Sequence, residues 1–113
     1  MSLSSFIPIF EALGNETRLR VFEYIYRSGS AGARPKELID KFGFDSGTLD
    51  FHLKKLIAVR LIAQKIGCRR GIYCAGENIP LELIFLFNSV LSGDNLPDLL
   101  PRLLSGKEMQ HFH

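Results

Sequence analysis

Apolar positions in the first half of the chain recur at the i, i+3, i+4 spacing of one helix face, and they predict four successive helices. The first helix is predicted near residues 4–13 and the second over residues 15–28. The third is short, because Pro35 suits a first helical position and Gly43 suits the end of a helix. A fourth helix follows this turn directly.

The third and fourth helices, joined by a turn that contains glycine, predict a helix-turn-helix over residues 35–58. Asp45 can accept hydrogen bonds from the free N–H groups that open the fourth helix. Leu49, Leu53 and Leu56 recur at helical spacing, so they are predicted to be buried. The opposite face is small and polar near its start and basic near its end, as suits a helix in a DNA major groove. The residues predicted to face a duplex are Ser46, Gly47, Thr48, Asp50, Phe51, Lys54 and Lys55.

After the fourth helix the apolar pattern shortens to that of strands, which predicts a β-hairpin wing over residues 61–75. Residues 61–66 and 72–75 are the two strands, and the turn falls either at 67–68 or at 69–71. Three basic side chains lie near this tip in the sequence, and they would contact a flanking phosphate or the minor groove of a bound duplex. They are Lys65, Arg69 and Arg70.

A further helix is predicted after Pro80, and it is apolar nearly all round. Residues 96–104 predict one more short helix that Pro101 kinks. One subunit of this size cannot readily cover so much apolar surface, so segments 1–14 and 79–104 are predicted to form the interface of a homodimer. The expected interface residues are Phe6, Ile7, Phe10, Ile84, Phe85 and Phe87.

Composition and charge narrow the class of protein. The 113 residues, 46% of them hydrophobic, predict one domain with one modest core. The net charge of +2 is weak evidence of nucleic-acid binding by itself. The distribution of charge is better evidence, because residues 51–76 hold six Lys or Arg and no acidic residue. A positive stretch that includes a helix and the adjoining hairpin favours double-stranded DNA as a partner.

Two segments resemble a known family. Glu11-Ala12-Leu13-Gly14-Asn15-Glu16-Thr17-Arg18-Leu19-Arg20 resembles the opening signature of the ArsR family of winged helix-turn-helix repressors. The segment Thr48-Leu49-Asp50-Phe51-His52-Leu53-Lys54-Lys55-Leu56 is similar to the recognition helix of that family. The resemblance spans roughly residues 9–76, and it departs at Asp50, where the family commonly has Ser, and at Gly67-Cys68, where it commonly has a Glu-Gly turn.

The resemblance implies a mainly α fold with a β-hairpin wing, dimerising through its first and last helices, and a repressor that binds operator DNA. Family members often release DNA on binding a metal, a metalloid or another small signal. Their cysteine or histidine ligands lie in stretches that correspond here to 33–38 and 87–92, and neither stretch contains Cys or His. We therefore expect no metal or other cofactor, and the effector is unknown.

The candidate DNA-facing residues also have plainer interpretations. Lys54 and Lys55 could be a solvated face, with Asp50 and Lys54 as an i, i+4 ion pair worth about 0.3–0.5 kcal/mol. Phe51 could contact a thymine methyl group or pack against the preceding helix. The alternative function is a winged-helix protein-interaction module without DNA binding, and Asp50 on the groove-facing surface is the feature of the sequence that favours it.

The histidines and cysteines are interpreted mainly as structural. His52 lies at the edge of the buried stripe, which favours a structural role, and His111 and His113 lie at a terminus that is expected to fray. Cys68 lies beside two arginines that could lower its pKa, so it is a candidate for redox chemistry. Cys74 is expected to be a small apolar core residue.

Several classes are excluded by what the sequence does not contain. No catalytic triad spacing, phosphate-binding glycine loop or cluster of carboxylates is present, so an enzyme is not expected. The start of the chain does not resemble a signal peptide, and the apolar run near residues 79–91 is too short to span a bilayer. We expect a cytoplasmic protein with reduced cysteines.

Overall fold

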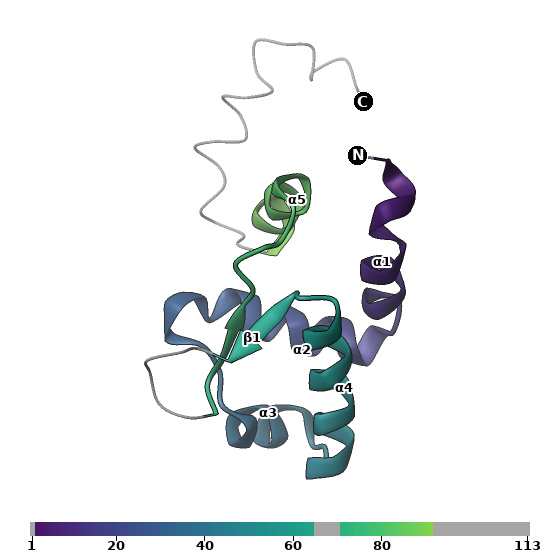
Figure 1. Cartoon of the computed structure of the whole chain (residues 1–113). Helices are drawn as coiled ribbons and strands as arrows, with labels where there is room; N and C mark the ends of the chain where they lie inside the picture. The colour runs from purple at the N-terminus through teal and green to yellow at the C-terminus, as the bar shows by residue number, and fades with distance from the viewer. Residues whose placement is uncertain (1, 65–70, 92–113) are drawn as a thin grey trace, which may run out of the picture. The chain divides into compact units, whose positions relative to one another are not determined.

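The computed structural model describes residues 2–64 and 71–91 (Figure 1). It divides into two compact units, Met1–Ile79 and Pro80–His113, and each is considered by itself. The first unit is mostly helical and ends in a two-stranded antiparallel hairpin. In chain order its elements are η1 (Leu3–Phe6), α1 (Ile7–Leu13), α2 (Glu16–Arg27), η2 (Gly29–Ala31), α3 (Pro35–Phe42), α4 (Ser46–Ala58), β1 (Ile62–Gln64) and β2 (Tyr73–Ala75).

The boundaries of the central helices follow from local capping, as predicted. The Asn15 side chain accepts a hydrogen bond from the Arg18 N–H at 2.9 Å and opens α2. Gly43 ends α3 in the left-handed conformation, with φ of 76°. The Asp45 side chain accepts from the Thr48 N–H at 2.7 Å and opens α4. These caps fix where the third and fourth helices stop and start.

The first predicted helix is shorter than expected. Residues 3–6 form the 3₁₀ turn η1, and the α-helix begins only at Ile7. Pro8 explains the boundary, because it has no N–H to donate and is accommodated only in the first turn of an α-helix.

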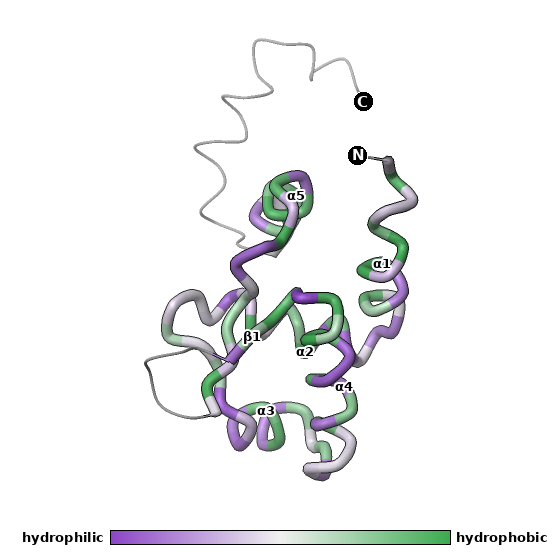
Figure 2. The backbone as a smooth tube through the Cα atoms, in the orientation of Figure 1, coloured by the Kyte–Doolittle hydropathy of each residue, from purple (hydrophilic) through white to green (hydrophobic). Residues whose placement is uncertain are grey.

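The core lies between α2, α4 and the hairpin. Val21, Phe22 and Ile25 of α2 are fully buried, and Leu49, Leu53 and Leu56 of α4 form the buried stripe that the sequence predicts; Leu38, Leu61 and Ile62 complete the core. Each such aliphatic side chain contributes about 1.5–3 kcal/mol when it is fully buried. Figure 2 shows the resulting alternation of hydrophobic and hydrophilic segments along α3 and α4.

The hairpin pairs in one clear register, with Ile62 opposite Ala75, Ala63 opposite Cys74 and Gln64 opposite Tyr73. Its turn lies in residues 65–70, outside the described part of the chain, so both turn alternatives remain predictions.

A third segment joins the hairpin by backbone pairing. Ala33 and Tyr73 exchange two backbone hydrogen bonds of 2.8 Å each. The preceding Gly32, at φ of 71°, is required there because a Cβ atom would collide with the Ile72 and Cys74 side chains. The loop before α3 thus anchors the hairpin to the helix-turn-helix.

The second unit is described by Pro80 and α5 (Leu81–Leu91). The Pro80 carbonyl accepts from the Leu83 and Ile84 N–H groups at 2.9 and 3.0 Å, so the helix starts where proline predicts. Large apolar side chains on α5 are exposed, among them Leu81, Phe85, Leu86 and Val90. The predicted helix over residues 96–104 lies outside the described residues.

Candidate nucleic-acid interface

α4 presents the face that was predicted to meet DNA. Its buried leucines fix the rotation of the helix, and α2 and α3 both pack against it. All seven predicted residues on this helix are exposed: Ser46, Gly47, Thr48, Asp50, Phe51, Lys54 and Lys55. A rigidly held helix with one free face can enter a major groove without rearrangement.

The start of this face is open and carries small side chains. Gly47 lies in the first turn, where an added Cβ atom would meet only the Asp45 carboxylate at 3.7 Å. Asp45 uses its carboxylate on the Thr48 N–H, and this hydrogen bond lowers the pKa of Asp45. The N-terminus of α4 thus offers small side chains and its positive dipole end to a phosphate or a base edge.

The middle of the face combines charge and an aromatic ring. Lys54 and Asp50 form the predicted i, i+4 ion pair at 3.1 Å, and both side chains are well exposed. The Phe51 ring is 53% exposed, so it does not take the packed alternative. The Lys55 ammonium lies 5.4 Å from the centre of that ring. This face therefore presents two ammonium groups, the Asp50 carboxylate as a hydrogen-bond acceptor, and the apolar ring of Phe51.

His52 lies beneath this face, as the structural interpretation predicts. It is buried, and its Nδ1 lies 3.4 Å from the Arg18 guanidinium, which can only donate. This hydrogen bond requires the ring to accept at Nδ1, so it favours the neutral form of His52. Burial, and secondarily the charge of Arg18, lower the pKa of His52.

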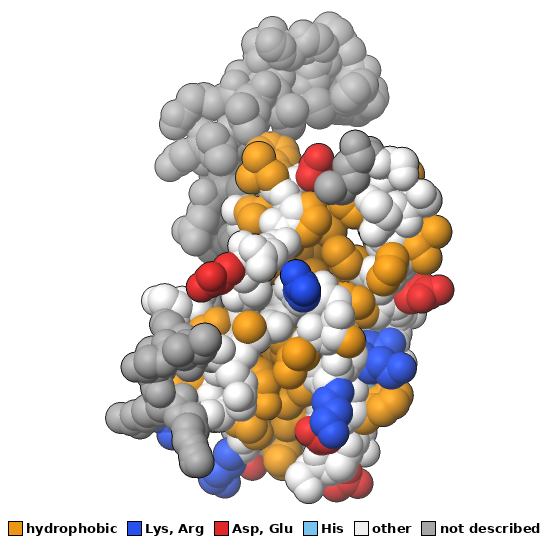
Figure 3. All heavy atoms as spheres, in the orientation of Figure 1, with side chains coloured by type: hydrophobic (Ala, Val, Ile, Leu, Met, Phe, Trp, Pro, Cys, Tyr) orange, Lys and Arg blue, Asp and Glu red, His pale blue; other side chains and the backbone are white. Residues whose placement is uncertain are grey.

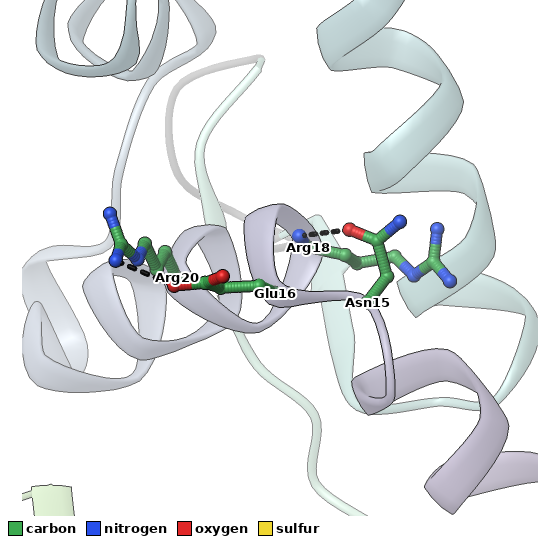
Figure 4. Close-up of polar contacts among 4 residues, drawn as sticks. All are labelled: Asn15, Glu16, Arg18 and Arg20. Atoms are coloured by element: carbon green, nitrogen blue, oxygen red, sulfur yellow. Dashed lines mark hydrogen bonds and ion pairs between the residues drawn. The ribbon is translucent and has the colours of Figure 1, made fainter.

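Arg18 positions α4, and the sequence interpretation did not assign it this role. Its Nε donates to the Ala12 carbonyl at 2.6 Å, so one buried side chain joins the end of α1 to α2 and α4. Figure 4 shows Arg18 and Arg20 leaving α2 on different sides, with Arg20 in an exposed ion pair to Glu16 at 2.7 Å. The spacing of residues along α2 could have indicated that Arg18 is buried, because Arg18 lies on the same helix face as Val21, Phe22 and Ile25.

A second contact fixes α3 against α2. The Tyr24 hydroxyl donates to Glu37 at 2.7 Å, and the other carboxylate oxygen of Glu37 accepts from the Arg34 N–H at 2.9 Å. These hydrogen bonds lower the pKa of Glu37, with the tyrosine bond as the larger cause. The helix before the turn is thereby held to the core.

Lys65, Arg69, Arg70 and the redox candidate Cys68 lie outside the described residues. On the face shown in Figure 3, Lys and Arg side chains lie among acidic ones. Cys74 is a free, half-buried cysteine opposite Ala63. Cys74 was predicted to be a core residue, but its side chain is only partly buried.

Among residues 2–64 and 71–91, no three His, Cys, Asp or Glu side chains gather closely enough to hold a metal ion. No helix in the same part of the chain is long and apolar enough to cross a membrane.

Comparison with known proteins identifies the central segment. Residues 13–65, from the end of α1 past β1, match a family model described as a helix-turn-helix domain. This segment is therefore similar to helix-turn-helix domains. The match includes α2, α3, α4 and β1, the elements that build the exposed α4 face. No curated protein and no solved structure matches the chain.

Proposed function

We propose that this protein is a transcriptional regulator, most simply a repressor, that binds an operator duplex as a homodimer with α4 in the major groove. The observation that carries the proposal is the exposed face of α4 in a helix-turn-helix domain. Small residues at its start allow close approach, and Lys54 and Lys55 near its end can contact phosphates. The resemblance to ArsR repressors supports the repressing role and the dimer.

Asp50 gives the proposed face its selectivity. A carboxylate near phosphates is repulsive unless it accepts from a cytosine amino group, so it lowers general affinity and favours one base. In the free protein Lys54 neutralises it at 3.1 Å. The hairpin, with Lys65, Arg69 and Arg70, would add sequence-independent phosphate contacts.

The test is a salt series on binding to a random 30-base-pair duplex. A protein that neutralises several phosphates shows a steep fall of log affinity with log salt, by about 0.9 for each contact. We expect the Lys54→Gln, Lys55→Gln variant to reduce that slope by about two units. The matched control is Arg20→Gln, Arg27→Gln, which removes two exposed cations from α2 and should leave the slope unchanged.

The second candidate is a protein-interaction module, and the Asp50–Lys54 pair favours it because it cancels charge on the presumed groove face. This function would show no salt-dependent affinity for any duplex, and the α4 variant would behave like its control. That result would overturn the DNA-binding proposal.

A further inference from the structure

A hollow of about 700 Å³ lies beside the hairpin, within the first compact unit. The end of α4, both strands, the η2 turn and the residues after β2 line it. Its size is within the range of sites for small organic ligands. The groove-facing residues Asp50, Phe51 and Lys54 do not line it, so it is separate from the proposed DNA surface.

Apolar atoms make up most of its surface where the strands and α4 meet. Ile57 projects from the last turn of α4, Ile62 lies on β1, and Cys74 and Ala75 lie opposite on β2. Ile57 is 40% exposed although it is a large aliphatic residue. A hydrocarbon group bound here would remove such surface from water, which is favourable in proportion to the area covered.

Two unpaired charges of opposite sign line the same hollow. The Arg60 guanidinium makes no ion pair or hydrogen bond with any described residue, and neither does the Glu77 carboxylate. The two are therefore not bonded to each other. An arginine at an apolar hollow is suited to a planar carboxylate, which it can bind through two parallel hydrogen bonds. A ligand with a second negative charge would be repelled by Glu77.

The backbone conformation of Arg60 is independent evidence that its side chain has a function. Arg60 ends α4 with φ of 64°, where the Leu61 N–H bonds to the Leu56 carbonyl at 3.0 Å. Glycine is the residue this position favours, and a larger residue is strained there. Strain of this kind concentrates where a side chain has a function.

We propose that this hollow binds a small monocarboxylic acid with an apolar body, its carboxylate on Arg60 and its hydrocarbon over Ile57 and Cys74. The inference does not depend on DNA binding. The hollow is lined by the end of α4 and by both strands of the hairpin, so an occupant would touch the two elements that carry the proposed DNA contacts.

Calorimetric titration of the full chain with octanoate, octanamide and octylamine tests the head group at constant hydrocarbon. We expect octanoate to bind with a dissociation constant of about 0.1–1 mM, as suits a ligand of this size, and the amide and amine at least about tenfold more weakly. Arg60→Gln should lower octanoate affinity about tenfold and leave octanamide unchanged. The matched control, Arg27→Gln, removes an exposed arginine that does not line the hollow and should change neither.

A second readout locates the ligand. Octanoate should slow alkylation of Cys74 by iodoacetamide, as measured by mass spectrometry of the peptide that contains it, and Ala63→Met should abolish this protection by filling the hollow. Equal binding of all three probes, an Arg60→Gln effect no larger than that of Arg27→Gln, or unaltered alkylation of Cys74 would overturn the proposal. None of these outcomes bears on the salt dependence of duplex binding, so the two proposals fail separately.

Discussion

At the scale of single residues, Arg60 has a backbone conformation that residues with a Cβ atom rarely adopt. It holds a positive φ of 64° at the end of α4. Arg60→Gly should raise the free energy of unfolding by about 0.5–1 kcal/mol, because glycine enters this conformation without steric cost. Urea denaturation measures the change. The control Arg60→Ala removes the same side chain but keeps the Cβ atom, and it should show no gain. A loss of stability in the glycine variant would mean that the arginine side chain contributes packing that outweighs its strain.

At the scale of elements, the contact between Arg18 of α2 and His52 of α4 makes their packing depend on pH. Burial and the neighbouring guanidinium lower the pKa of His52 from its usual value of 6.5, so the folded state favours the neutral ring. Stability from this site is therefore complete above about pH 6.5 and is lost as pH falls through the lowered pKa. Urea midpoints from pH 8 to pH 5 should fall more steeply for the wild type than for His52→Gln. Parallel curves for the two proteins would contradict this reading.

At the scale of the whole molecule, apolar side chains on two helices predict a homodimer. Ile7 and Phe10 of α1 are 49% and 46% exposed, and Phe85 of α5 is 45% exposed, whereas Phe6 is already buried and meets Phe10 edge to face at 6.0 Å. Stable dimers bury about 800 Å² on each partner, and such side chains would supply the centre of that area. Light scattering at micromolar concentration should give twice the monomer mass for the wild type. Ile7→Asp and Phe85→Asp should give the monomer, while the control Thr17→Asp, at an exposed polar position of α2, should not. A monomeric wild type would rule the dimer out.

The local architecture could be predicted from the order of residues alone, because capping and periodicity act within one or two helical turns. Asn15 and Asp45 each cap the helix that follows, and Gly43 ends α3, all through contacts only a few residues apart. The spacing of Leu49 and Leu53 fixed which face of α4 is buried, and hence which face remains free. The existence of the hairpin also followed from a local change of period.

Contacts between residues far apart in the chain could not be predicted in this way, because they depend on how the whole unit packs. Arg18 and His52 are 34 residues apart, and nothing in the spacing of either indicates the other. The pairing of Ala33 with Tyr73 depends on where the hairpin returns. The hollow at Arg60 exists only because separate segments meet there. Periodicity and capping specify how a segment folds and which side it buries, but the partner on that side is chosen by packing the whole unit.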